Sequence, residues 1–299
     1  MKVKPINYKP LQSGDPCKLE PGQALDCALT IDVEDWYQSC VDLNAKISER
    51  VVKNVDTILS LLNKNCVKAT FFVQGKVLES FPKIGQVLIS EGHEVQSHGY
   101  SHQSLLKMNQ KELEREIEFS KKTVEDACGV KVTSFRAPDF SINETNFWVL
   151  DKIAEAGFTL DSSIFPIRMR RYGIAGWETR PHKIEFTGGN SIIEVPVAIW
   201  AKNKIKIPVG GGGYFRLMPL NWIQRMINSI TTNGQPVIIY CHPYEFNKKE
   251  LMEYKGRSPE IFRVTQGWGR SRFSWKIQEI LSRFSFGRLD HLLKSRNIL

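Results

Sequence analysis

The sequence predicts an α/β fold with a largely parallel sheet, because short apolar runs typical of strands alternate with stretches of helical periodicity. The chain has 299 residues, of which 41% are hydrophobic, so it can bury the core of one α/β barrel or of two smaller domains. Polar residues stand at or just after the ends of five expected strands, the edge where α/β barrels form active sites. We therefore expect a site at the carboxyl edge of the sheet, whether the sheet is open or closed into a barrel.

The first half of the chain begins with two expected strands separated by a helix. The apolar run of residues 28–32 is followed by residues 47–62, in which Ile, Val and Leu recur at helical spacing. The next expected strands are residues 69–73, 94–96 and 133–135, and the helices between them are residues 83–90 and 109–128. The second of these helices should begin with a capping box between Asn109 and Glu112 and end at Gly129.

The second half continues the same alternation. Helices are expected over residues 144–156, ending at Gly157, and over residues 221–231. The expected strands are residues 159–161, 192–197 and 236–240. Because no linker is evident, we expect an N-terminal extension over residues 1–25 and one barrel over residues 26–299, with a basic helical extension from about residue 250.

Basic charge is concentrated near the C-terminus. The formal net charge is +9, and residues 251–299 supply +6 of it through ten Lys and Arg against four Asp and Glu. Such a region could face nucleic acid, an anionic membrane or an anionic substrate, or simply be a solvated surface. No RNA-binding aromatic signature accompanies the charge, so we expect no nucleic-acid partner. Residues 271–286 predict a helix that either lies on an anionic membrane or packs on the barrel.

Two further features bear on localisation. Residues 1–25 contain no apolar stretch like that of a signal peptide, and no run reaches the roughly 18 apolar residues of a spanning helix. The six cysteines are dispersed and include no C-x-x-C pair, which favours free thiols in a reducing compartment. We expect a cytoplasmic protein, or one that is peripheral at the inner face of the membrane. The oligomeric state is left open.

Two histidines and a group of acids predict a metal site. His98 and His102 are four residues apart, and Asp32, Glu34 and Asp35 follow an apolar strand about sixty residues earlier. Imidazole nitrogen and carboxylate oxygen suit zinc, cobalt or similar ions, and two or three protein ligands leave positions open for water and substrate. The acids could instead cap a helix N-terminus, where a carboxylate is also favoured.

Three more polar residues, Arg136, Asp161 and His242, stand at the ends of later strands. The glycine run of residues 210–213 lacks the Lys-Ser/Thr of a phosphate loop, so it either lets the backbone approach a sugar or makes a flexible turn. We assign the following Tyr214 to substrate binding. No G-x-S-x-G motif is present, which counts against a serine hydrolase.

From about residue 29 to residue 246, these residues resemble the polysaccharide deacetylase family, the NodB-homology fold of carbohydrate esterase family 4. The motifs that carry the resemblance are Thr30-Ile31-Asp32-Val33-Glu34-Asp35, the pair His98 and His102, Arg136-Ala137-Pro138-Asp139, Asp161 and His242. The resemblance implies a deformed (β/α)7-type barrel. The Asp-Val-Glu-Asp form of the first motif, the glycine run and the basic tail look most like the branch found with bacterial exopolysaccharide and O-antigen loci.

The resemblance also implies a role for each acid of the first motif. Asp32 corresponds to the general base. The next family residue is the metal ligand, and Val33 cannot serve, so the ligand is Glu34 or Asp35. Asp32 and Glu34 point the same way if the strand continues, whereas a turn after Asp32 favours Asp35. The ion itself would be one divalent metal, zinc first, with cobalt or nickel as alternatives.

The remaining motif residues receive their roles in the same way. His242 corresponds to the general acid, Asp161 would position or tune His242, and Arg136 would orient Asp32 and keep it ionised. Asp139 stands where the family has tyrosine, and its backbone N–H would contact the substrate oxyanion.

Taken together, these residues predict a metal-dependent hydrolase that removes an N-acyl group, N-acetyl first, from an amino sugar or glycan in bacterial surface-polysaccharide synthesis. Two alternatives remain. One is an amidohydrolase of the same fold that opens cyclic amides or removes formyl groups. The other is a non-catalytic glycan-binding relative.

Overall fold

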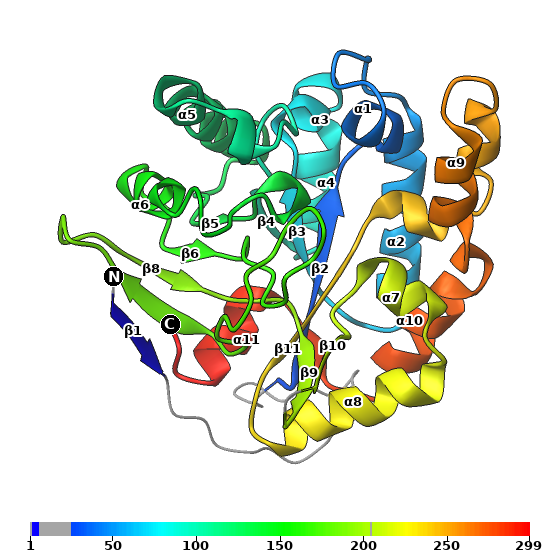
Figure 1. Cartoon of the computed structure of the whole chain (residues 1–299). Coiled ribbons are helices and arrows are strands. Elements are labelled where there is room, and N and C mark those ends of the chain that lie inside the picture. The colour runs from blue at the N-terminus through cyan, green and yellow to red at the C-terminus, as the bar shows by residue number, and fades with distance from the viewer. Residues whose placement is uncertain (1, 6–24, 204) are drawn as a thin grey trace.

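The computed structural model of the 299-residue chain describes residues 2–5, 25–203 and 205–299. A mixed sheet lies at the centre with helices around it (Figure 1). Its parallel part, in spatial order β8-β6-β5-β4-β3-β2-β11, contains seven strands among the described residues. In chain order these strands are β2 Cys27–Val33, β3 Thr70–Val73, β4 Glu94–Ser97, β5 Ser134–Phe135, β6 Leu160–Asp161, β8 Ser191–Glu194 and β11 Val237–Cys241.

Backbone hydrogen bonds bring the two ends of this sheet together. The segment after β8 lies beside β11, where Ala198 N donates to Ile238 O at 2.9 Å and Tyr240 N donates to Gly210 O at 2.6 Å. The prediction of a deformed (β/α) barrel is therefore confirmed. Short additional strands flank it: β1 Lys2–Pro5, β7 His182–Glu185, the hairpin of β9 Ile199–Lys202 and β10 Ile205–Pro208, and β12 Phe286–Gly287.

The helices match the expected periodic segments in most places. In chain order they are α1 Trp36–Cys40, α2 Arg50–Lys64, α3 Gly75–Ser80, α4 Lys83–Ser90, α5 Gln110–Cys128, α6 Trp148–Glu155, α7 Gly212–Leu217, α8 Leu220–Thr232, α9 Glu260–Gly267, α10 Phe273–Leu281 and α11 Leu289–Ser295. The predicted capping box of α5 is present between Asn109 and Glu112, and Gly129 ends the helix in the left-handed conformation with φ of 67°.

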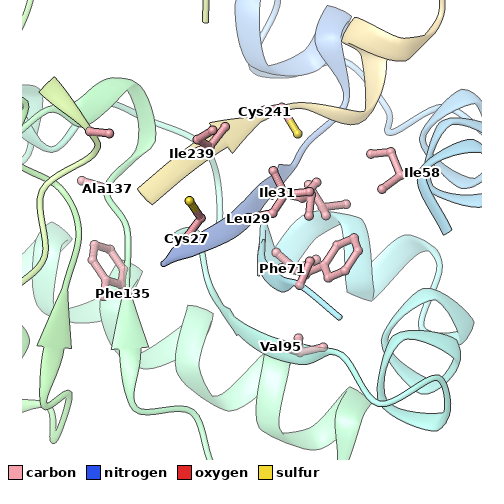
Figure 2. Close-up of a cluster of buried hydrophobic side chains, with 14 of the residues drawn as sticks. Cys27, Leu29, Ile31, Ile58, Phe71, Val95, Phe135, Ala137, Ile239 and Cys241 are labelled. Atoms are coloured by element: carbon pink, nitrogen blue, oxygen red, sulfur yellow. The ribbon is translucent and has the colours of Figure 1, made fainter. Parts of the chain in front are cut away.

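Strand alternation separates the core from the interior of the barrel. Leu29 and Ile31 of β2 join a cluster that includes Phe71 of β3 and Ile58 of α2 (Figure 2). The residues between them on β2 point the other way, because successive strand side chains face opposite sides of a sheet. Thr30, on that side, accepts a hydrogen bond from the Arg136 guanidinium, so β2 supplies both the core and the polar interior.

The C-terminal segment packs on the barrel, which decides between the two alternatives for residues 271–286. Phe273, Ile277 and Ile280 of α10 are buried. Lys276 is buried as well, and its ammonium donates to the carbonyl oxygens at the end of α7, including that of Arg216 at 2.6 Å. The expected helix is also too long, because α10 ends at Leu281 and the chain re-enters the sheet as β12.

Four cysteines, Cys27, Cys40, Cys128 and Cys241, are free thiols, but Cys66 is disulfide-bonded, so the expectation of free thiols throughout is wrong. None of the helices in the described part of the chain is both long and apolar enough to cross a bilayer.

Candidate active site

Two histidines and one glutamate meet at the carboxyl edge of the barrel. Glu34 directly follows β2, His98 directly follows β4, and His102 lies in the next loop. One ligand atom from each of these buried side chains lies within 4.8 Å of the other two. His98 Nε2 is 3.5 Å from Glu34 Oε2, and His102 Nε2 contacts the same oxygen. The three side chains therefore point to one centre.

Neighbouring groups fix these side chains in place. His98 Nδ1 is 2.9 Å from the Arg136 carbonyl oxygen, which leaves Nε2 to face the centre. Glu34 Oε1 accepts a hydrogen bond from the Tyr244 hydroxyl at 3.0 Å, which leaves Oε2 facing the imidazoles. Burial acts to raise the pKa of Glu34. The neighbouring imidazoles of His102, His98 and His242 outweigh burial and bring that pKa well below the usual value, so the carboxylate is ionised. Two imidazole nitrogens and one carboxylate oxygen are a donor set that fits a catalytic zinc ion.

Asp35 lies outside this group. It is the N-cap of α1, and its Oδ1 accepts from the backbone N–H groups of Tyr37 and Gln38, each at 3.0 Å. Its Oδ2 accepts from the Ser48 backbone N–H at 3.0 Å and from the Ser48 hydroxyl. Because both oxygens are engaged, the expectation that Asp35 could be a metal ligand is wrong, and Glu34 is the carboxylate of the group. β2 stays extended through Val33, so Asp32 and Glu34 face the same side, as a continued strand predicts.

Asp32 is held by Arg136, as we expected. The guanidinium Nη1 is 2.7 Å from Asp32 Oδ1, and both side chains are buried. Arg136 is fixed in turn by hydrogen bonds to Thr30 and to the Ser162 carbonyl and hydroxyl oxygens, and it lies 4.3 Å from the centroid of the Phe72 ring. These contacts leave the guanidinium little freedom, so it orients the Asp32 carboxylate.

Asp161 does not contact His242, so its expected role must be corrected. Asp161 accepts from the Ser163 backbone N–H at 2.9 Å and from the Ser163 hydroxyl at 2.7 Å. Burial raises the pKa of Asp161 and raises that of the neighbouring Glu194 well above its usual value, so this acid pair retains a proton. The physical reason is local: Ser163, two residues after Asp161, takes up the Asp161 carboxylate, whereas a carboxylate three residues after His242 reaches that imidazole.

Glu245 takes the place that we had given to Asp161. Its Oε2 is 3.2 Å from His242 Nδ1 and also accepts from the His242 backbone N–H at 3.0 Å. His242 Nε2 is 3.9 Å from Glu34 Oε1, so the ring faces the metal-ligand group. Burial acts to lower the pKa of His242, but Glu245 and Glu34 raise it to about 9. The imidazole is therefore a proton donor at neutral pH.

Glu245 was not among the predicted site residues, although the sequence contains a local signal for it. Residues 243–246 form a 3₁₀ turn directly after β11, with Pro243 at its start. His242 is the N-cap residue of this turn, and the side chain three residues later folds back on it, as in a capping box. The carboxylate is nearly fully buried and is paired at 3.1 Å with Arg216 of α7.

These groups share one pocket of about 790 Å³. Asp32, Glu34, His98, His102 and His242 all line it. A pocket of this volume lies in the range of small-ligand sites, and its walls come from both halves of the chain. A substrate in it can therefore contact the metal-ligand group, the Asp32 carboxylate and the His242 imidazole together.

Of the two residues that we expected to bind substrate, Asp139 lines the pocket and Tyr214 does not. Asp139 lines the pocket, with φ of 56° and its carboxylate 3.5 Å from the Arg171 guanidinium. Tyr214 is not among the lining residues, and its hydroxyl lies 3.8 Å from the Met169 sulfur. The pocket wall is formed instead by Gly212, Gly213 and Arg216 of the same segment.

Glycine is required in the first part of the run of residues 210–213, because the backbone there lies too close to β11 for a side chain. At Gly211 a Cβ would collide with the Tyr240 carbonyl oxygen, and the residue has φ of 152°. The run therefore allows α7 to start close to β11, beside His242.

The barrel and the residues at its carboxyl edge define a class of α/β-barrel proteins with a histidine and carboxylate site. Residues 28–160, somewhat less than half of the chain, match the family model described as polysaccharide deacetylase. Residues 162–294 match a second model, described as a domain of unknown function, DUF3473. The second region supplies β8, β11 and His242, so both regions build one barrel and one pocket.

Curated relatives match part of this chain. The chain is 32% identical over 117 residues to a peptidoglycan-N-acetylglucosamine deacetylase of Bacillus cereus, covering 35% of this chain and 42% of the relative. It is 34% identical over 95 residues to a bifunctional xylanase/deacetylase of Pseudobutyrivibrio xylanivorans, covering 31% of this chain and 16% of that protein. The chain thus spans less than half the length of these curated relatives.

Two solved structures share the fold over most of their length. A structure described as a putative polysaccharide deacetylase from Mycobacterium smegmatis has a TM-score of 0.61 at 17% identity, covering 96% of this chain and 95% of that one. A structure of Puue allantoinase has a TM-score of 0.61 at 10% identity, covering 90% and 89%.

Proposed function

We propose that this protein is a metal-dependent hydrolase that removes an N-acyl group, N-acetyl first, from an amino sugar of a bacterial surface glycan. One observation carries the proposal. The buried group of Glu34, His98 and His102 shares a pocket with an Asp32–Arg136 pair and a His242–Glu245 pair. Amide hydrolysis needs a base for the attacking water and an acid for the leaving amine, and the two pairs supply both.

Glu34, His98 and His102 would hold the metal ion. When bound, a divalent ion of this kind polarises an acyl carbonyl and lowers the pKa of a water molecule. Zinc fits the donor set best, with cobalt or nickel as alternatives. Asp35 takes no part in this set and supports it only by capping α1 directly after Glu34.

Two side chains move protons. The Asp32 carboxylate accepts the proton of the attacking water, and Arg136 holds it in position at 2.7 Å. The His242 imidazolium donates a proton to the departing amine nitrogen, and Glu245 holds that ring through Nδ1. The Asp139 backbone N–H, at the pocket wall, is our candidate donor to the substrate oxyanion.

The glycan context rests on similarity. Relatives of residues 28–160 include deacetylases of peptidoglycan, and the chain's own Asp32-Val33-Glu34-Asp35 motif and glycine run resemble the branch associated with exopolysaccharide and O-antigen loci. We propose an amino-sugar unit of such a glycan as the substrate. Localisation at the inner face of the membrane would suit a lipid-linked form of it.

A substrate panel tests this function. Acetate release should be measured on N-acetylglucosamine oligomers, on a nucleotide-linked N-acetyl sugar and on a lipid-linked N-acetyl sugar, with zinc added and with Asp32→Asn as the inactive control. We expect release from at least one of them in the wild type only. Turnover of allantoin or of a formylated sugar alone would instead identify a cyclic-amide or formyl hydrolase. Saturable glycan binding without turnover of any substrate would identify a non-catalytic relative.

A further inference from the structure

A short helix outside the barrel exposes an apolar face. α9 buries none of its residues, and Ile261, Val264 and Trp268, spaced so that they lie on one side of the helix, are 74%, 60% and 68% exposed. Met252, in the preceding turn, is 67% exposed. We call these four residues the α9 surface. Figure 1 shows α9 at the outer edge of the molecule.

A groove of about 400 Å³ runs between α9 and the preceding 3₁₀ turn. It is lined by Leu251, Met252, Val264 and Trp268, with Lys248 and Arg263 among its walls. The apolar side chains of such a groove can contact lipid acyl chains, while the cations at its walls contact anionic headgroups.

The segment that carries the α9 surface is rich in exposed cations. Five exposed basic residues between positions 248 and 272 form no ion pair with a carboxylate in the part of the chain that the structure describes: Lys248, Lys249, Lys255, Arg257 and Arg272. The exposed acids of this region are already paired, Glu253 with Arg50 and Glu260 with Arg263. The exposed apolar side chains of the α9 surface are therefore accompanied, in the same segment, by uncompensated positive charge.

The inner side of α9 belongs to the active-site pocket. Phe262, Thr265 and Gln266 line that pocket, and the Phe262 ring is stacked 5.8 Å from Trp36, which directly follows the Glu34-Asp35 turn. The same helix thus has one side toward the substrate and the other toward solvent. Whatever binds the α9 surface lies close to the entrance of the pocket.

We propose that the α9 surface docks the protein on an anionic lipid bilayer, so that the pocket opens next to the membrane. Exposed Trp and aliphatic residues among Lys and Arg are the pattern of interfacial binding, in which apolar burial adds to attraction by anionic headgroups. A second copy of the chain is a poorer occupant, because a symmetric contact would bring the five cations of one copy against those of the other. The docking goes beyond the proposed function and does not depend on it.

Co-sedimentation with vesicles tests the proposal without any substrate. The wild type should sediment with vesicles of equal parts phosphatidylglycerol and phosphatidylcholine, should sediment far less with pure phosphatidylcholine, and should be released by high salt. The triple variant Lys248→Gln, Lys249→Gln, Lys255→Gln should weaken partitioning by about fivefold for each cation removed. The double variant Val264→Ser, Trp268→Ser should weaken partitioning onto the vesicles at every salt concentration.

Matched controls separate docking from general charge and apolarity. Lys111→Gln with Lys122→Gln removes two exposed cations of α5, and Ile205→Ser removes an exposed apolar residue of β10, 60% exposed. Both should sediment like the wild type, and all variants should keep the wild-type unfolding temperature because the changed residues are exposed. A wild type that stays in the supernatant at low salt overturns the proposal. An equal loss of vesicle sedimentation in the α9 and control variants also overturns it. A dimer that light scattering shows to dissociate only in the α9 variants would overturn it as well.

Discussion

His242 Nδ1 lies 3.2 Å from Glu245 Oε2, and the Glu245 carboxylate is itself paired at 3.1 Å with Arg216. This chain of contacts joins the strand end of β11 to the first turn after the glycine run. It gives the imidazole a fixed orientation and a partner that stabilises its protonated form.

Glu245→Gln should lower the pKa of His242, because a neutral amide removes the charge that offsets burial. A general acid works only when protonated, so activity is lost as pH rises through its pKa. The alkaline limb of the profile of kcat/KM against pH should therefore move to lower pH in the variant, while the acid limb stays in place.

Asp161→Asn is the matched control for that experiment, since Asp161 contacts Ser163 and not His242. Its alkaline limb should stay where it is in the wild type. A shift in Asp161→Asn but not in Glu245→Gln would return the positioning role to Asp161.

Glu34→Gln and Asp35→Asn should separate the metal ligand from the helix cap. Glu34→Gln should lose bound metal, because the carboxylate facing both imidazoles becomes a neutral amide. Asp35→Asn should keep the metal and lose about 1 kcal/mol of stability, because Asn still caps the helix but its amide nitrogen cannot accept the two Ser48 hydrogen bonds. Metal content and denaturant unfolding measure the two effects, and metal loss confined to Asp35→Asn would reverse the assignment.

Asp32→Asn should leave metal content unchanged and lower kcat by about 10²- to 10⁴-fold, the usual contribution of a general base. The amide retains the size of the carboxylate and can still contact Arg136, so the fold should be preserved. Circular dichroism checks the fold, and acetate release checks the rate. A rate near that of the wild type would exclude Asp32 from the mechanism.

His242→Ala should affect amide and ester substrates differently. An amine leaves poorly unless it is protonated, whereas an activated phenolate leaves unaided, so only amide cleavage needs the acid. The variant should keep its metal and much of its rate on an activated acetyl ester, yet lose most of the deacetylation of an amino sugar. Equal losses on both substrates would indicate a structural or metal-supporting role for His242.

The sequence predicted a largely parallel α/β sheet because its strands and helices are locally encoded, whereas closure into a barrel was implied by the family resemblance. Alternating apolar runs mark the parallel strands, and the capping box at Asn109 with a glycine at position 129 marks both ends of α5. The same patterns placed Asp32, His98 and His102 at one edge, since parallel strands share their carboxyl ends. The choice between Glu34 and Asp35 needed the local turn, which only the structure shows.

Long-range partners were not predictable in this way. Asp161 ends β6 and Glu245 follows β11, but only the structure shows that Ser163 takes up the Asp161 carboxylate and that the turn after β11 folds Glu245 back onto His242. The apolar residues of α10 and α9 have the same helical spacing, yet α10 packs on the barrel and α9 stays exposed. Burial depends on the surface that the rest of the chain presents, which periodicity does not encode.

Metal reconstitution tests the central claim, that Glu34, His98 and His102 hold the ion on which hydrolysis depends. The protein should be stripped with a chelator and titrated with zinc, while bound metal and acetate release are followed together. The account predicts that activity rises in proportion to bound metal and that both saturate at about one ion per chain. It also predicts that the double variant His98→Ala, His102→Ala binds no metal and stays inactive. Full activity of the stripped protein, or full metal occupancy in the double variant, would contradict it.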